Sequence, residues 1–140
     1  MRGTGSVAVF ALSYFLYMFS VVIPTYNHAE FLETALKSVL DQTFRDFEVI
    51  VVNNYSTDDT LSVIERLGDP RVQVINFRNH GVIGASRNVG IKASQAPYVA
   101  FLDSDDTWEV SKLAKIAETA QMSEMCASMV EGVKDMMVDI

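Results

Sequence analysis

The fold is decided by the stretch Phe47-Glu48-Val49-Ile50-Val51-Val52, a nearly continuous apolar run rich in β-branched residues. Similar short runs occupy residues 20–23, 72–77 and 98–102, and each is followed by the apolar spacing of an amphipathic helix. Strands without in–out alternation are typical of sheets that are covered on both faces. The chain is therefore predicted to adopt an α/β fold, with a mostly parallel sheet built from βαβ units and flanking helices.

Three local signals concern the helices between these strands. Asn27 is followed three residues later by Glu30, which predicts a capping box at the start of the first helix. The sequence Gly68-Asp69-Pro70 predicts the end of the second helix. Gly90 lies inside the third helix, where a glycine weakens the helix unless another part of the chain approaches closely.

The composition is that of one globular domain. The chain has 140 residues, of which 49% are apolar and 21% are charged, and these values are typical of a folded protein. Its net charge of −7 repels polyanions, so nucleic acid is not expected as a partner. An anionic nucleotide would need a metal ion or a local arginine to bridge the charge. The single cysteine, Cys126, excludes an intrachain disulfide.

The amino-terminal end is unusually apolar. Residues 7–23 carry no charge, but assigning residues 20–23 to the first strand leaves only about thirteen apolar residues, too few to cross a bilayer. Two interpretations of this hydrophobic leader, residues 1–19, stay open. It associates with a membrane through residues 5–19, or it packs on the domain or on a partner.

The rest of the chain divides into two parts. Residues 20–120 are expected to form the domain. Five of the seven methionines lie beyond it, so residues 121–140 form a methionine-rich segment with an adaptable apolar face, to which no chemistry is assigned. We expect the protein in the cytoplasm or on the cytoplasmic face of a membrane.

Polar residues follow three of the four predicted strands. Because ligands bind outside the carboxyl ends of the strands in an open parallel sheet, these three segments form a candidate site at one edge. A solvated acidic turn that caps the next helix is the alternative for the last of them. The segments are Pro24-Thr25-Tyr26-Asn27, Asn53-Asn54-Tyr55-Ser56 and Asp103-Ser104-Asp105-Asp106.

The side chains of this edge have complementary chemistry. The cluster Asp103–Asp106 would repel itself without a cation, and Mg²⁺ is typically held by carboxylates together with substrate phosphates. Tyr26 offers a flat face for a base, and the amides of Asn53 and Asn54 can hydrogen-bond a base or a ribose. Arg87, in the first turns of a helix, matches phosphate oxygens bidentately.

Each of these residues also has a purely structural interpretation. Tyr26 can cover the first helix, the two asparagines can shape a turn, and Arg87 can form a surface ion pair. His28 and His80 are weaker candidates for a ligand or a base, since they fall in a first helical turn and a loop.

Four segments of the sequence together resemble the family 2 glycosyltransferases. They are residues 21–27, 47–60, 84–90 and 101–108, in the order expected for that family. The resemblance implies a Rossmann-like GT-A fold, which binds a nucleoside-diphosphate-sugar donor, often UDP-linked, together with Mg²⁺ or Mn²⁺.

The resemblance also implies roles for individual residues. Thr25 and Tyr26 would contact the nucleoside and Arg87 would face the diphosphate, while Asp103–Asp106 would be the D-x-D element that holds ribose and metal. Taken together, the strand-end argument and the resemblance give the expected substrate-binding residues Pro24, Thr25, Tyr26, Asn53, Asn54, Arg87, Asp103 and Ser104, and the expected metal ligands Asp103, Asp105 and Asp106.

The sequence departs from the family in two places. Many members have an aspartate pair where this chain has Asn53-Asn54. An amide can still hydrogen-bond uracil, but it lacks the negative charge of a carboxylate. The acceptor half of the family, with its carboxylate base, lies beyond the D-x-D element, and this chain shows no recognisable pattern after about Lys115. We therefore expect a fold truncated in its C-terminal part, and no residue is assigned as the base.

The expected function is that of a glycosyltransferase. It would transfer a sugar from the donor to a hydroxyl of a saccharide or lipid-linked acceptor, as in polysaccharide biosynthesis, with inversion at the anomeric carbon. The alternative is a catalytically inert nucleotide-binding fragment. A nucleotidyltransferase is disfavoured, because residues 24–30 contain neither the glycine nor the lysine or arginine that would grip a triphosphate.

Overall fold

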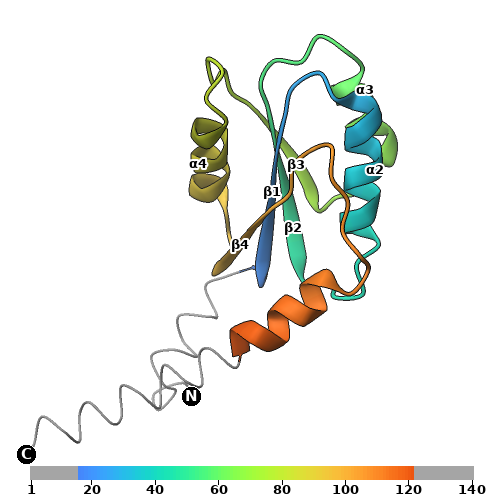
Figure 1. The fold of residues 1–140 in the computed structure, drawn as a ribbon, viewed down its shortest axis with the longest axis vertical. Helices are drawn as coiled ribbons and strands as arrows, with labels where there is room; N and C mark the ends of the chain where they lie inside the picture. Colours follow the sequence, from blue (N-terminus) through green and yellow to red (C-terminus); the bar gives the residue numbers. More distant parts are fainter. Residues whose placement is uncertain (1–15, 122–140) are drawn as a thin grey trace, which may run out of the picture.

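Strands and helices alternate along residues 16–121, the part of the chain that the computed structural model describes (Figure 1). The leader predicted at residues 1–19 and the methionine-rich segment predicted at 121–140 lie outside this part except at its margins. None of the helices within residues 16–121 has the length and hydropathy that crossing a membrane requires. A last helix spans residues 112–121. The elements before it are β1 (Phe19–Thr25), α2 (Ala29–Leu40), β2 (Phe47–Asn53), α3 (Thr60–Leu67), β3 (Val72–Asn76), α4 (Ile83–Ala93) and β4 (Tyr98–Phe101).

The four strands form one parallel sheet in the order β3-β2-β1-β4. Thr25 at the end of β1 is paired with Asn53 at the end of β2, and Asn53 is paired with Asn76 at the end of β3. The predicted parallel α/β sheet is thus confirmed. Its carboxyl ends meet at one edge, as the candidate site requires.

Both faces of the sheet are covered, which explains the missing alternation in its strands (Figure 1). In β1, Val21 and Ile23 belong to the larger core, together with α2 and Leu113 of the last helix. Val22 points to the opposite face, where it packs with Ile50 and the α4 residues around Val89. Burial on both sides favours an apolar residue at nearly every position of a central strand.

Helix α4 packs unusually close to the sheet at Gly90. A Cβ atom added there would lie 2.3 Å from Cγ1 of Val22. Two carbon atoms that are not bonded to each other cannot come so close. Glycine weakens the helix, and the close contact with β1 is the reason for its presence.

The predicted capping box at Asn27 is wrong. Helix α2 begins at Ala29, and its N-cap residue, His28, makes no side-chain capping bond. The backbone amide of Ala29 instead donates to Asp58 of the next strand–helix connection, at 3.0 Å. A neighbouring loop therefore supplies the cap. The predicted end of α3 is confirmed, because Gly68 follows it in the left-handed conformation.

The segment after the acidic residues is fixed to the end of α2 by a buried amide. Gln42, only 1% exposed, donates to the backbone oxygens of Ser38 and Glu109 and accepts the backbone amide of Leu113. Since a buried polar group is costly unless it is bonded, this amide anchors residues 109–113 firmly. The acidic cluster thus lies between β4 and an anchored segment.

Candidate functional site

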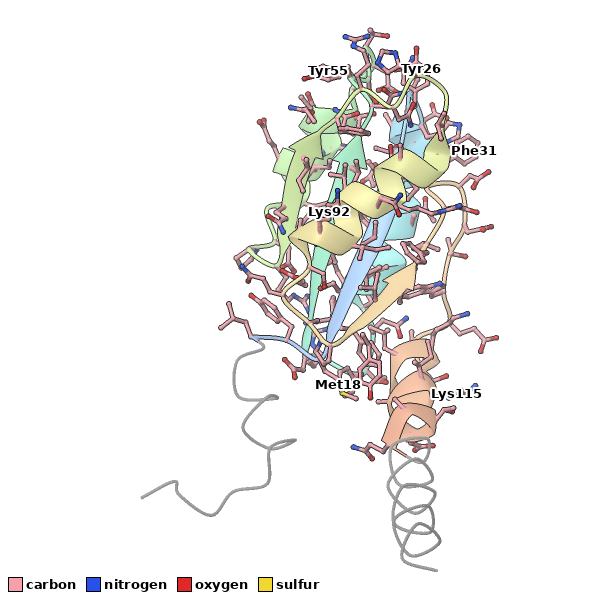
Figure 2. All side chains as sticks on the ribbon, turned by 90° about the vertical axis from the view of Figure 1, so that its left-hand side faces the viewer. Met18, Tyr26, Phe31, Tyr55, Lys92 and Lys115 are labelled. Atoms are coloured by element: carbon pink, nitrogen blue, oxygen red, sulfur yellow. The ribbon has the colours of Figure 1, made fainter. Side chains whose placement is uncertain are left out.

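A cleft of about 410 Å³ opens at the carboxyl edge of the sheet. Figure 2 shows Tyr26, from the end of β1, at the same end of the molecule as Tyr55 and opposite to Met18. The residues that line the cleft are Pro24, Thr25, Tyr26, His28, Asn79, Ile83, Arg87, Asp103, Ser104 and Asp105. Most of the site residues expected from the sequence therefore surround one space.

Arg87 and Asp103 form an ion pair in this cleft. Nη2 of Arg87 lies 3.1 Å from Oδ1 of Asp103, and the two side chains are 39% and 55% exposed. An ion pair with this exposure stabilises a protein by only about 0–1 kcal/mol. A more strongly charged ligand could therefore replace Asp103 as the partner of the guanidinium with little loss of stability.

The acidic residues form a compact group beside Arg87. Asp103, Asp105 and Asp106 are all exposed, and each can bring one carboxylate oxygen within 4.8 Å of the other two. The amide of Asp106 donates to the backbone oxygen of Asp103 at 3.0 Å, which closes the turn. We call residues 103–106 the acidic turn. Oxygen ligands of this kind suit Mg²⁺ and similar hard cations.

Asp106 occupies a different position from the other two carboxylates. It lines an adjoining hollow of about 330 Å³, together with Asp103, Trp108 and Lys112, and not the cleft itself. A cation held by all three carboxylates would lie at the boundary between the two spaces.

Two polar atoms at the cleft are buried without a hydrogen-bond partner. They are Oγ1 of Thr25, a residue that is 5% exposed, and Nε of Arg87. More than nine in ten buried polar groups in proteins are bonded. Both atoms belong to residues that line the cleft, so water or a ligand bound there is the natural source of the missing partner.

Asn53, the last residue of β2, and Asn54, which follows it, do not line the cleft. Asn53 is 1% exposed, and its amide is engaged with Asn76 and Ser56. Asn54 accepts the backbone amide of Asn79 at 3.1 Å. Asn53 therefore fixes the ends of β2 and β3, while Asn54 reaches the cleft only through Asn79.

Sequence reasoning gave little or no weight to three of the lining residues: His28, Asn79 and Ile83. His28 is bonded through Nδ1 to Oγ of Ser104. Asn79 is bonded to Ser86 and to the amide of Gly81. It follows the end of β3, so the rule that ligands bind at the carboxyl ends of strands applies to it as well. Ile83, an exposed apolar residue, carries no comparable signal.

The connections after β1 and β2 are bonded to each other. The side-chain oxygen of Asn27 accepts the backbone amide of Thr57 at 2.8 Å. The backbone amide of Asn27 donates to Oγ of Ser56. Partial burial raises the pKa of Asp58, but hydrogen bonds from Thr60 and Ala29 outweigh it and hold this pKa below its usual value. The carboxylate form of Asp58 is thus favoured where it joins the two connections.

Comparison with protein-family models matches residues 20–131 to the family described as glycosyl transferase family 2. This range includes β2, β3, β4, all of β1 except its first residue, and every lining residue of the cleft. The chain belongs to glycosyl transferase family 2.

Relatives of this chain carry names that describe sugar transfer. The chain is 38% identical over 96 residues to WfaP of Escherichia coli, a UDP-Glc:alpha-D-GlcNAc-diphosphoundecaprenol beta-1,3-glucosyltransferase, and the match covers 68% of this chain and 38% of WfaP. The chain spans less than half of the length of the curated relatives that it matches, for example 43%, 35% and 14% of three of them.

Solved structures of the same kind confirm the GT-A fold. S. aureus TarS in complex with UDP is 36% identical to this glycosyl transferase family 2 chain, with a TM-score of 0.68 over 72% of this chain and 31% of TarS. The mannosyltransferase PcManGT of Pyrobaculum calidifontis, in complex with GDP-Man and Mn²⁺, is 26% identical. Its TM-score is 0.64 over 70% of this chain and 30% of PcManGT.

Proposed function

We propose that the cleft binds a nucleoside-diphosphate-sugar, with UDP as its nucleotide, together with Mg²⁺ or Mn²⁺. The observation that carries this proposal is the arrangement around one space of an aromatic ring, a guanidinium and an acidic turn. The unsatisfied atoms of Thr25 and Arg87 support it, because both residues line the same cleft. The chain would be the donor-binding part of a glycosyltransferase.

The residues would divide the donor among them. Tyr26, which is 53% exposed, offers its ring for stacking on the base, and Pro24 and Thr25 lie beside it on β1. Arg87 would leave Asp103 for the diphosphate, to which guanidinium binds bidentately.

The three carboxylates would hold the metal ion. The chemistry of this donor set fits Mg²⁺ or Mn²⁺, since it consists of carboxylate oxygens. When bound, the ion stabilises the negative charge that develops on the departing diphosphate. Ser104, between two of the ligands, would contact the ribose side of the donor.

The relatives support this choice of ligands. TarS binds UDP and UDP-GlcNAc, and PcManGT binds GDP-Man with Mn²⁺. WfaP is named for transfer from UDP-Glc to a lipid-linked sugar. We extend these properties to this chain: the donor would be a UDP-sugar, bound with a divalent metal ion. The acceptor would be a saccharide or a lipid-linked molecule, whose hydroxyl attacks the anomeric carbon of the sugar with inversion.

We further infer that residues 20–120 form the donor-binding unit and that residues 5–19 provide any contact with a membrane. We also propose that the protein lies in the cytoplasm or on the cytoplasmic face of a membrane. The proposed membrane contact is supported by residues 5–19, which carry no charged side chain.

A second candidate function is a nucleotide-binding fragment without catalysis. The observation that favours it concerns the described residues that line the cleft: their carboxylates are Asp103 and Asp105, both within the acidic turn. Activation of an acceptor hydroxyl needs a further base. Within residues 16–121 the lining of the cleft offers no third carboxylate for that task.

Calorimetric titration with UDP, GDP and TDP, each with and without Mn²⁺, tests the proposal. We expect metal-dependent binding of UDP, which Asp105→Ala abolishes because it removes a proposed metal ligand. Asp41→Ala, at an exposed aspartate that ends α2, is the matched control and should bind as the unchanged chain does. Absence of metal-dependent binding for all three nucleotides would overturn the proposal.

A further inference from the structure

His28 bridges two walls of the cleft that are far apart in the sequence. It precedes α2, and its Nδ1 lies 2.9 Å from Oγ of Ser104, 76 residues further along the chain. The ring also packs edge-on against Phe31, with centroids 5.8 Å apart and an interplanar angle of 75°. The imidazole is therefore oriented by one contact on α2 and one on the acidic turn.

Ser104 holds a central place in that turn. It is 5% exposed, although Asp103 and Asp105 on either side of it are exposed. Arg87 restrains the turn through Asp103, and the backbone bond from Asp106 to Asp103 restrains it from within. The bond from His28 to Ser104 joins it to the opposite wall of the cleft.

The distances between the carboxylates affect how well they bind a cation. Ligand oxygens lie about 2.0–2.1 Å from Mg²⁺, so two oxygens on one ion are at most about 4.2 Å apart. The three carboxylates already come within 4.8 Å of one another. Since their charges repel, restraints on the backbone between them decide how much the turn must contract.

We propose that His28 is a positioning residue. Its hydrogen bond to Ser104 holds the carboxylates of the acidic turn at distances from one another close to those that a bound divalent cation requires. The inference rests on the proposed function, because it concerns the metal site of the same cleft. The residue binds neither the cation nor the nucleotide; it acts through Ser104.

A general structural role of His28 can be separated from this one. The side chain makes no capping bond to α2, so its removal takes no cap from that helix. The effect of substitution should therefore appear in the affinity for metal more than in the stability of the fold.

Electron paramagnetic resonance of Mn²⁺, titrated into the full chain in the presence of UDP, measures that affinity directly. We expect His28→Ala to weaken Mn²⁺ binding by about threefold to tenfold, as the loss of one net hydrogen bond does. His28→Asn places an amide atom near the position of Nδ1 and should restore most of the affinity. His28→Gln places its amide near Nε2 and should not.

Two further comparisons make the result specific. His80→Asn replaces the other histidine, which lies outside the lining of the cleft and has a left-handed φ of 52° that asparagine tolerates, and it should leave Mn²⁺ affinity unchanged. In a double-mutant cycle titrated with Mn²⁺ in the absence of UDP, so that the proposed ribose contact of Ser104 plays no part, Ser104→Ala should add little to His28→Ala, because both remove the same bond.

The outcomes distinguish this inference from the proposed function. If the unchanged chain binds no Mn²⁺ with UDP, the proposed function fails. If it binds and His28→Ala binds equally well, or if His28→Asn and His28→Gln behave alike, the positioning role is wrong and the proposed function stands. Thermal unfolding, followed by circular dichroism, shows the temperatures at which each variant is folded. The Mn²⁺ titrations are compared at those temperatures.

Discussion

Thr25 keeps a buried hydroxyl without a partner at the very end of β1. Leaving such a group unsatisfied costs a protein about 1–3 kcal/mol. The same residue lines the cleft, as does Arg87 with its unpartnered Nε. Unsatisfied groups gathered at one cleft are typical of binding sites, where stability is reduced in favour of a ligand.

Replacing this hydroxyl separates binding from stability. Thr25→Val keeps the shape of the side chain and removes the unsatisfied oxygen, so we expect the free energy of unfolding to stay equal or to rise by up to about 1 kcal/mol. The affinity for UDP with Mn²⁺ should fall by about threefold to tenfold, as for one lost hydrogen bond. Urea denaturation and calorimetry measure the two quantities.

Thr60→Val is the control for this substitution. Thr60 is fully buried, and its hydroxyl donates to Asp58, so the same chemical change should here destabilise the fold by about 1 kcal/mol. A Thr25→Val variant that loses stability like Thr60→Val and binds UDP normally would contradict the ligand role of Thr25.

The residues of the site also show what a sequence can and cannot predict. The rule that ligands bind at carboxyl strand ends led to Thr25, Tyr26 and the acidic turn, all of which line the cleft. It could not foresee that Asn53 has its amide engaged by Asn76 and Ser56. Hydrogen-bond partners from other strands depend on register, which periodicity does not encode.

At the scale of elements, the depth at which α4 packs determines the position of Arg87. Gly90 lies against Val22 of β1, three residues after Arg87 on the same helix. The backbone oxygen of Val22 accepts the amide of Leu102, the residue before Asp103. Both partners of the ion pair are thus placed relative to one residue of the central strand.

A methyl group at position 90 tests this arrangement. Gly90→Ala would collide with Val22, and we expect it to lower the free energy of unfolding by about 1–3 kcal/mol, as overpacking does. Because α4 must shift outward, the affinity for UDP should fall as well. Urea denaturation and calorimetry of the folded variant check both effects.

Gly84→Ala provides the comparison within the same helix. No atom lies within 4 Å of a Cβ added there, so the better helix propensity of alanine should leave stability equal or raise it by up to about 1 kcal/mol. Equal effects of the two substitutions on stability would show that close packing is not the reason for glycine at position 90.

The helices were harder to predict from the sequence than the strands. The apolar runs at residues 47–52 and 72–77 indicated strands because burial on both faces leaves a continuous pattern. The start of α2 was misassigned, since its cap comes from Asp58, 29 residues away from Ala29. A cap supplied by another loop leaves no local signature.

At the scale of the whole molecule, donor binding and sugar transfer are separable properties. We expect the 140-residue chain to bind UDP with metal but to transfer sugar from UDP-glucose or UDP-GlcNAc at no more than the background rate. The reason is the lining of the cleft within residues 16–121, where the carboxylates are those of the acidic turn and His28 is bonded to Ser104.

An assay of UDP release, with saccharide and lipid-linked acceptors and Asp105→Ala as the blank, checks this expectation. Sustained, acceptor-dependent release by the unchanged chain would show that it contains a base, and would refute the inert-fragment alternative.

The general architecture was accessible from the sequence, but the order of the strands was not. The alternation of apolar runs and helical stretches predicts parallel strands, whereas the order β3-β2-β1-β4 depends on which side each connection takes. The resemblance to family 2 glycosyltransferases added the GT-A fold, which the matches to TarS and PcManGT confirm.

The bonds between the first two strand–helix connections have a consequence for the thermodynamics of recognition. Asn27 holds Thr57, and Asp58 holds Ala29, so the backbone that follows Tyr26 is tied to the next connection, and the residue before it belongs to β1. A nucleotide that docks on this ring would meet a rigid platform. Little freedom would then be lost on association, and more of the contact enthalpy would remain as affinity.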